Sequence, residues 1–104
     1  MLLVTTGQVP GRKVQRTLGL VKGSSARARN VGRDILALAK NVVGGEVEEY
    51  TKLIGESREQ ALDRMSAEAE KMGANAIVGM RFTSSTVSQG VAEILAYGTA
   101  VVLE

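Results

Sequence analysis

The side chains that could carry chemistry in this chain are carboxylates, lysine, arginine, tyrosine and hydroxyls, because the 104-residue sequence has no histidine and no cysteine. Without histidine, the usual general base at neutral pH and the commonest transition-metal ligand are missing. Without cysteine, thiolate nucleophiles, disulfides and cysteine-ligated zinc or iron–sulfur sites are excluded. We therefore predict that the protein is not an enzyme. The alternative hypothesis is an enzyme in which Tyr50, Arg58 or Arg81 works with a carboxylate at a subunit interface.

An acidic cluster, Glu46, Glu48 and Glu49, follows the pair Gly44 and Gly45. Its oxygen atoms suit a hard cation, but carboxylates at a helix start are also what the helix dipole favours. The glycine pair lacks the Lys-Ser/Thr of a phosphate-binding loop, so it predicts a hinge between helices. The cluster therefore has two interpretations, a cation site and a helix terminus.

Arg58 falls within an apolar stripe when residues 46–72 are placed on a helix with about 100° per residue. The members of that line are Val47, Ile54, Arg58, Met65 and Met72, flanked by Tyr50, Ala61, Leu62 and Ala69. In one interpretation, Gly55 bends the helix and the long stem of Arg58 reaches water along the core edge. In the other, Arg58 is buried, in the protomer or at a subunit interface, beside a carboxylate, with Glu46 favoured.

The helices and strands that position these groups are predicted from the spacing of apolar residues and from the positions of Gly and Pro. We expect strands at 2–6 and 14–22 that pair with each other, helices at 31–43 and 46–72, and a hairpin of strands 76–83 and 91–103 around a loop at 84–90. Residues 23–29 have no clear pattern. The hairpin register predicts that Arg81 faces Glu93, and the glycines at 79 and 98 predict close approach of another element.

Size and charge indicate one small α+β domain spanning residues 1–104 that is stabilised by oligomerisation, since only three aromatic residues are available for its core. Residues 1–45 hold eight basic and one acidic side chain, whereas 46–72 hold four basic and eight acidic ones. This asymmetry favours complementary protein surfaces over nucleic acid, because no aromatic platform lies near the arginines in the sequence. The sequence shows no signal peptide and no membrane span, so we expect a soluble, cytoplasmic protein.

Four spaced sequence blocks together resemble the YbjQ-like family of uncharacterised prokaryotic proteins. They are Gly44-Gly-Glu-Val-Glu-Glu-Tyr-Thr51, Arg58 with Ala61-Leu62 and Met65, Gly73-Ala-Asn-Ala-Ile-Val-Gly79, and Tyr97-Gly-Thr-Ala-Val101. The resemblance covers essentially the whole chain. It implies a ββααββ-type α+β subunit, with an antiparallel sheet and two helices, assembled as a ring-shaped pentamer. It also carries a heavy-metal-binding label, which conflicts with the lack of thiolate and imidazole ligands.

The resemblance implies candidate ligand-binding or interface residues at the positions that match the polar residues of the family motifs. These are Glu46, Tyr50, Arg58, Asn75 and Arg81. Each also has a structural interpretation, in the same order: helix cap, core aromatic, interface ion pair, turn former and cross-strand pair. We predict that the protein is a non-catalytic homo-oligomeric ring scaffold or small-ligand-binding module, and that its partners are other copies of the same chain. The alternative is a metal-binding protein with oxygen ligands, and no particular cofactor is implied.

Overall fold

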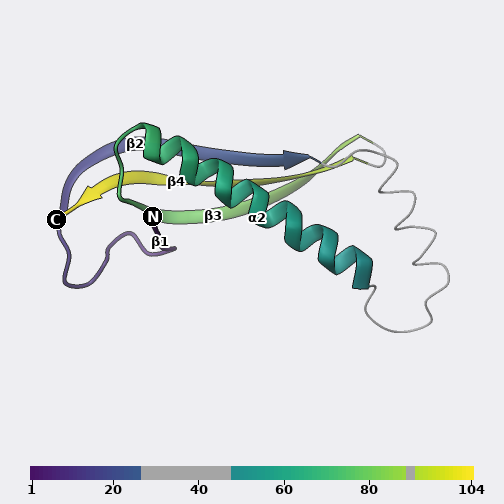
Figure 1. The fold of residues 1–104 in the computed structure, drawn as a ribbon, viewed down its shortest axis with the longest axis horizontal. Coiled ribbons are helices and arrows are strands. Elements are labelled where there is room, and N and C mark those ends of the chain that lie inside the picture. Colours follow the sequence, from purple (N-terminus) through teal and green to yellow (C-terminus); the bar gives the residue numbers. More distant parts are fainter. Residues whose placement is uncertain (27–47, 89–90) are drawn as a thin grey trace.

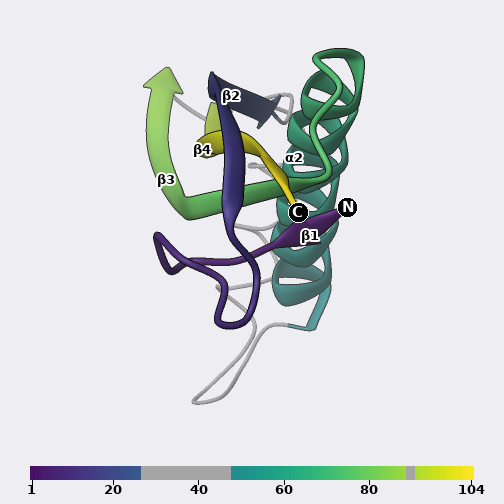
Figure 2. The ribbon, with the colours of Figure 1, turned by 90° about the vertical axis from the view of Figure 1, so that its left-hand side faces the viewer.

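The computed structural model describes residues 1–26, 48–88 and 91–104 of the chain, and side chains for 1–25, 52–85 and 93–104. The strands are β1 (Leu2–Leu3), β2 (Val14–Ala26), β3 (Ala76–Ser88) and β4 (Val91–Leu103), and the helix is α2 (Glu48–Lys71). The helix lies along one side of the sheet (Figures 1 and 2). The described part of the chain is therefore a single α+β domain, and the helix expected at 31–43 lies outside it.

The four strands form one mixed sheet in the order β1-β3-β4-β2. Strands β3 and β4 form the expected antiparallel hairpin, although β3 extends to Ser88 through residues that were predicted to be a loop. Strand β2 also pairs antiparallel with β4, but β1 runs parallel to β3. The prediction of a purely antiparallel sheet is therefore wrong.

The expected pairing of β1 with β2 is also wrong, because the two strands lie on opposite edges of the sheet. Strand β1 has only two residues, whereas β2 and β4 have thirteen each and can share a long ladder. The connection between β1 and β2 passes around one end of the sheet (Figures 1 and 2). Its residues Val4 and Val9 pack on a buried cluster of Ala76, Val78, Val101 and Leu103, so hydrophobic burial favours this route.

Helix α2 packs on the sheet through Ala61, Met65 and Ala69, which are fully buried. They meet a cluster from the strands, namely Val21, Ile77, Met80, Ala96 and Ala100. This confirms the central part of the predicted apolar stripe. Two members of that line do not fit, because Met72 is 38% exposed and the side chain of Arg58, which was predicted within the stripe, is 53% exposed. The helix crosses the strands diagonally, so its C-terminal half lies over the sheet and its first turns extend beyond it (Figure 1).

Two glycines allow close approaches, Gly23 between β2 and the helix and Gly98 between β4 and β3. A Cβ atom on Gly23 would collide with the backbone nitrogen of Met65 and the carbonyl oxygen of Ala61, and one on Gly98 would lie 2.7 Å from Cγ2 of Ile77 and 3.2 Å from Cα of Met80. The close approach predicted at Gly98 is thus confirmed. Glycine at position 79 has a different explanation. Residue 79 lies in a bulge of β3 with a φ of +62°, which favours glycine, and no atom lies within 4 Å of the place that a Cβ atom would occupy.

Replacement of Gly23 by alanine should destabilise the fold, because the added methyl group occupies the position of the helix backbone. We expect the free energy of unfolding to fall by about 1–3 kcal/mol, measured by urea denaturation at fixed protein concentration. The matched control is Gly7→Ala, since nothing lies within 4 Å of that position and its φ is not positive. Equal stability of the two variants would contradict the close contact of α2 with β2.

Candidate functional site

The residues predicted from sequence do not gather into one site in the described part of the chain. Glu46 lies outside the described residues, and Tyr50 lies in the first turn of α2 with only its backbone described. Arg58, Asn75 and Arg81 lie on α2, on the turn before β3 and within β3. Each of these three has its own surroundings, and these decide what it can do.

Arg58 is a surface residue of the described chain. Its Nε atom lies 4.0 Å from Oε1 of Glu59, and the side chains of the two residues are 53% and 66% exposed. This contact is too long for a hydrogen bond and too exposed to contribute much stability. The interpretation of Arg58 as a charge buried within the protomer is therefore wrong, and a role at a subunit interface stays a prediction.

Asn75 joins the start of β3 to the end of β4. Its side-chain amide donates a hydrogen bond from Nδ2 to the carbonyl oxygen of Leu103 (2.9 Å), and its Oδ1 accepts one from the backbone nitrogen of Leu103 (2.7 Å). Its backbone nitrogen also donates to the carbonyl oxygen of Val101 at 3.2 Å. The side chain thus continues the ladder of the sheet where regular pairing ends, which is a structural role.

Arg81 does not face Glu93 as predicted. It lies opposite Tyr97 of β4, and Glu93 lies opposite Ser85, because β3 continues through the predicted loop to Ser88, which pairs with Val91. The Nη1 atom of Arg81 donates hydrogen bonds to the carbonyl oxygens of Thr5 (2.7 Å) and Met80 (2.8 Å). Arg81 therefore fastens the segment after β1 to β3, and its guanidinium group is held in a fixed position.

A recess lies between α2 and the sheet where the two diverge. It has a volume of about 220 Å³ and is lined by Ile54, Arg58, Phe82, Thr83, Ser84 and Ile94. Ligand pockets for drug-sized molecules usually occupy about 300–1,000 Å³, so this recess suits only a small ligand or part of one. Phe82, which is 42% exposed, was missed in the sequence because only the tertiary structure places it beside Arg58.

Arg58 and Arg81 lie on opposite sides of β3. Met80 belongs to the core beneath α2 and Phe82 lines the recess with α2, so the residue between them points to the other face of the sheet. The recess therefore contains Arg58 but not Arg81. In the described part of the chain, the two arginines therefore face different surfaces.

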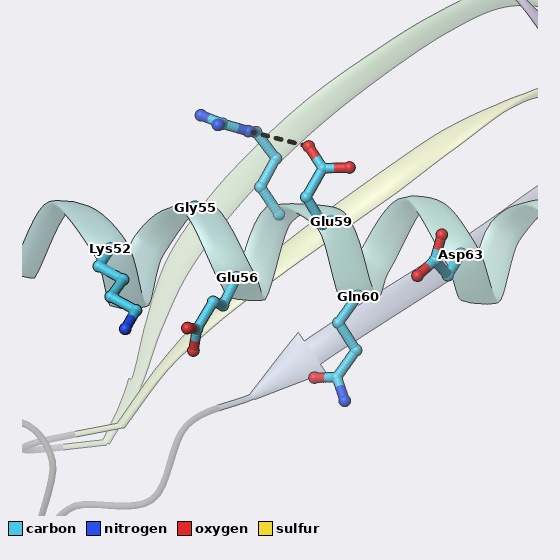
Figure 3. A pocket seen from close by; sticks show the side chains of 7 residues that line it. Lys52, Gly55, Glu56, Glu59, Gln60 and Asp63 are labelled. Atoms are coloured by element: carbon cyan, nitrogen blue, oxygen red, sulfur yellow. Dashed lines mark ion pairs between the residues drawn. The ribbon is translucent and has the colours of Figure 1, made fainter.

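A second, open depression runs along α2 and carries charges of both signs (Figure 3). Its lining residues are Lys52, Gly55, Glu56, Arg58, Glu59, Gln60 and Asp63. The side chains of Glu56 and Glu59 project in different directions, so their carboxylates do not converge (Figure 3). Within the described residues, no group of three acidic, histidine or cysteine side chains could hold a metal ion.

Within the described residues, each edge of the sheet has a stretch of strand that pairs on one side only. Along β3, the segment from Leu2 to Thr6 forms hydrogen bonds that end at Met80, and no described strand pairs with the outer edge of residues 82–88. On the other side of the sheet, β2 pairs with β4 alone among the described strands, and the carbonyl oxygen of Ser24 in β2 accepts a hydrogen bond from Nη1 of Arg64. These two edges lie on different strands and have different sequences.

Comparison with known proteins agrees with this geometry. A family model described as "Putative heavy-metal-binding" and named for YbjQ matches residues 1–104. The chain belongs to the YbjQ-like family. UPF0145 proteins of Dehalococcoides mccartyi strain 195 and Thermotoga maritima are 51% and 52% identical to it over 104 residues, which cover all of this chain and 100% and 98% of theirs. One from Clostridioides difficile is 54% identical and is covered over 93% of its length.

A crystal structure from Pediococcus pentosaceus shares the fold of this YbjQ-like chain. It is described as a protein of unknown function of the DUF74 family, and it aligns with a TM-score of 0.67 over 100% of this chain and 98% of its own. The sequence identity is 14%, so this likeness supports the fold alone. Within the described part of the YbjQ-like chain, no helix has the length and apolar character required to cross a membrane.

Asn75→Ala should destabilise the protein, because both hydrogen bonds to the backbone of Leu103 are lost. Leu103 is 3% exposed, so water cannot fully replace the missing partners. We expect a loss of about 1–3 kcal/mol in the free energy of unfolding, measured by chemical denaturation. Asn75→Asp keeps the acceptor and should lose less.

The control for this measurement is Arg58→Met, which keeps the stem of the side chain and removes an exposed charge. Surface ion pairs contribute about 0–1 kcal/mol, so we expect a change within that range. A larger loss for Arg58→Met than for Asn75→Ala at fixed protein concentration would show that Arg58 has a buried partner outside the described residues.

Proposed function

We propose that the protein functions as a non-catalytic homo-oligomeric ring, which serves as a scaffold or binds a small ligand. The observation that supports this proposal is the pair of free sheet edges, on β2 and on residues 82–88 of β3. Unpaired strand edges are templates for pairing with another chain, and proteins that stay monomeric usually block them with charges, proline or bulges. Residues 82–88 carry no charge and no proline.

The two edges favour head-to-tail assembly. Because each subunit has one edge on β2 and a different one on β3, the natural contact joins β2 of one copy to β3 of the next. A heterologous contact of this kind closes into a ring or continues as a filament. Strand β2 has regular pairing from Gly19 to Ala26, a stretch similar in length to residues 82–88 of β3. The number of five subunits rests on the family resemblance.

Apolar surface beside both edges supports the same proposal. Leu20 on β2 is 66% exposed and Phe82 on β3 is 42% exposed in the single chain. Burial of such side chains contributes roughly 1.5–3 kcal/mol each when it is complete. Assembly through the edges would remove part of this surface from water, and the recess beside Arg58 would remain as a place for a small anionic ligand.

Size-exclusion chromatography with light scattering tests the assembly. We expect the particle mass at micromolar concentration to be several times the 11.0 kDa mass of one chain. The double variant Thr83→Lys/Ser85→Lys places two charges beside the free edge of β3, so it should shift the protein towards the monomer. A monomeric wild-type protein would contradict the proposal.

The matched control is Gln8→Lys/Ala67→Lys, which adds the same two charges at exposed positions away from both edges. It should assemble as the wild-type protein does. If the Thr83→Lys/Ser85→Lys variant also keeps the wild-type mass, the assembly uses another surface and the edge contact is wrong.

A second candidate function is binding of a metal ion through oxygen ligands, which the description of the matching family model favours. The ligands would come from Glu46, Glu48 and Glu49, because hard cations prefer carboxylate oxygens and the chain has no thiolate or imidazole. In the described residues, Glu48 and Glu49 begin α2. This function does not exclude the ring, since a subunit can do both.

Calorimetry and thermal unfolding with Ca²⁺, Mn²⁺, Zn²⁺ and Cu²⁺ test this second candidate. A metal that binds the folded protein raises its melting temperature in a concentration-dependent way. The triple variant Glu46→Gln/Glu48→Gln/Glu49→Gln should lose that rise, whereas Glu68→Gln/Glu70→Gln at the other end of α2 should keep it. No heat and no thermal shift at millimolar metal would overturn the candidate.

A further inference from the structure

The sheet face opposite α2 carries a row of three side chains from three strands. The register places Tyr97 of β4 directly opposite both Lys22 of β2 and Arg81 of β3. Neighbouring strands are about 4.8 Å apart, so the backbone position of Tyr97 lies between those of Lys22 and Arg81. We call this set the Lys22/Tyr97/Arg81 row. Its members are separated by many residues in sequence, and only the pairing of the strands brings them together.

Strand alternation shows that the row points away from the helix. Ala96 and Gly98, on either side of Tyr97, are buried, and Ala96 belongs to the core beneath α2. Val21 and Gly23, on either side of Lys22, are also buried, and Gly23 touches the helix backbone. Successive side chains of a strand point to opposite faces, so Tyr97 and Lys22 lie on the outer face. There Tyr97 is 36% exposed.

The positive charge of the row is not neutralised within the described residues. The only ion pair there joins Arg58 to Glu59 on the helix. On the outer face, the adjacent positions along the three strands are Leu20, Ser24, Val78, Thr83, Leu95 and Thr99, and none is acidic. Arg81 is an exposed residue and donates two hydrogen bonds through Nη1, which holds its guanidinium group beside the segment after β1.

We propose that the Lys22/Tyr97/Arg81 row binds a nucleotide, with the base stacked on Tyr97 and the phosphate paired with Lys22 and Arg81. An aromatic ring on an open sheet flanked by cations is the arrangement that recognises bases and phosphates together. The sequence favoured protein partners over nucleic acid for lack of an aromatic platform near the cations. The strand register supplies that platform, and this site is independent of the proposed assembly.

The proposed ligand contains a base that stacks on Tyr97 and a phosphate. Both groups are present in a free nucleotide and in a single-stranded nucleic acid. The row runs across three neighbouring strands, and the chemistry of its side chains suits both kinds of ligand. Exposed Leu20 adds apolar surface along the same face. The experiment therefore includes one probe of each kind.

Tyrosine fluorescence gives a direct readout of the site, because the chain has no tryptophan and only two tyrosines, Tyr50 and Tyr97. In a Tyr50→Phe variant the remaining signal comes from Tyr97 alone. Titration with adenosine monophosphate, and separately with inorganic phosphate, should quench it with the nucleotide only. Fluorescence anisotropy of a labelled single-stranded oligonucleotide of about 12 nucleotides tests the nucleic-acid arm.

Variants separate stacking from charge. Tyr97→Ala should weaken binding at least about fivefold, whereas Tyr97→Phe keeps the ring and should bind as the wild type does. Lys22→Gln should weaken binding and reduce its dependence on salt, and Lys52→Gln on α2 is the matched control. These variants avoid Arg81, whose hydrogen bonds also hold the fold together.

The results with the two probes distinguish a free nucleotide from a nucleic acid as the ligand, and three results would overturn the proposal. Binding of both probes, with the oligonucleotide tighter and more sensitive to salt, supports nucleic acid, and binding of the mononucleotide alone supports a free nucleotide. Absence of quenching and of anisotropy change at millimolar mononucleotide and micromolar oligonucleotide would overturn the proposal. So would equal quenching by inorganic phosphate, or unchanged affinity in Tyr97→Ala.

Discussion

The backbone contact between α2 and β2 at Gly23 fixes the position of the helix on the sheet. A side chain on Gly23 would overlap the helix backbone at Ala61 and Met65, so the helix can lie this close only because Gly23 has no side chain. Two hydrogen bonds reinforce it, from Oγ of Ser25 to Oε1 of Gln60 and from Nη1 of Arg64 to the carbonyl oxygen of Ser24. The helix is therefore attached mainly to an edge strand.

This attachment decides which surfaces stay open. Helix α2 packs mainly on β2, and the recess beside Arg58 and Phe82 forms where the helix and the sheet diverge. On the other face, the described residues Val4 and Val9 cover the end of the sheet near Leu103. The remaining surface of that face carries Tyr97 between its two cations.

The free edges and the outer face are separate surfaces, so assembly and ligand binding need not compete. Pairing of β2 with β3 of another copy uses backbone groups in the plane of the sheet, whereas a stacked base would lie above that plane. An edge-joined ring would repeat the Lys22/Tyr97/Arg81 row once per subunit. Such repetition raises the effective affinity for a long anionic ligand through multivalency.

Local sequence patterns determined the hairpin of β3 and β4, the helix that α2 forms, its buried centre at Met65, and membership of the YbjQ-like family. These features depend on periodicity, glycine placement and short-range pairing, which a sequence displays directly. The sequence also named Asn75 and Arg81, but as members of one shared site, whereas each fastens a different pair of segments.

Only the tertiary structure decided the parallel pairing of β1 with β3, the exposure of Arg58 and the partner of Arg81. The pairing of β1 with β3 depends on which apolar surface the connection between β1 and β2 covers. The second depends on the diagonal crossing of a helix over a sheet, which helical periodicity does not contain. The third depends on where the hairpin turns, because β3 continues to Ser88, and the position of the turn decides which residues of β3 and β4 face each other.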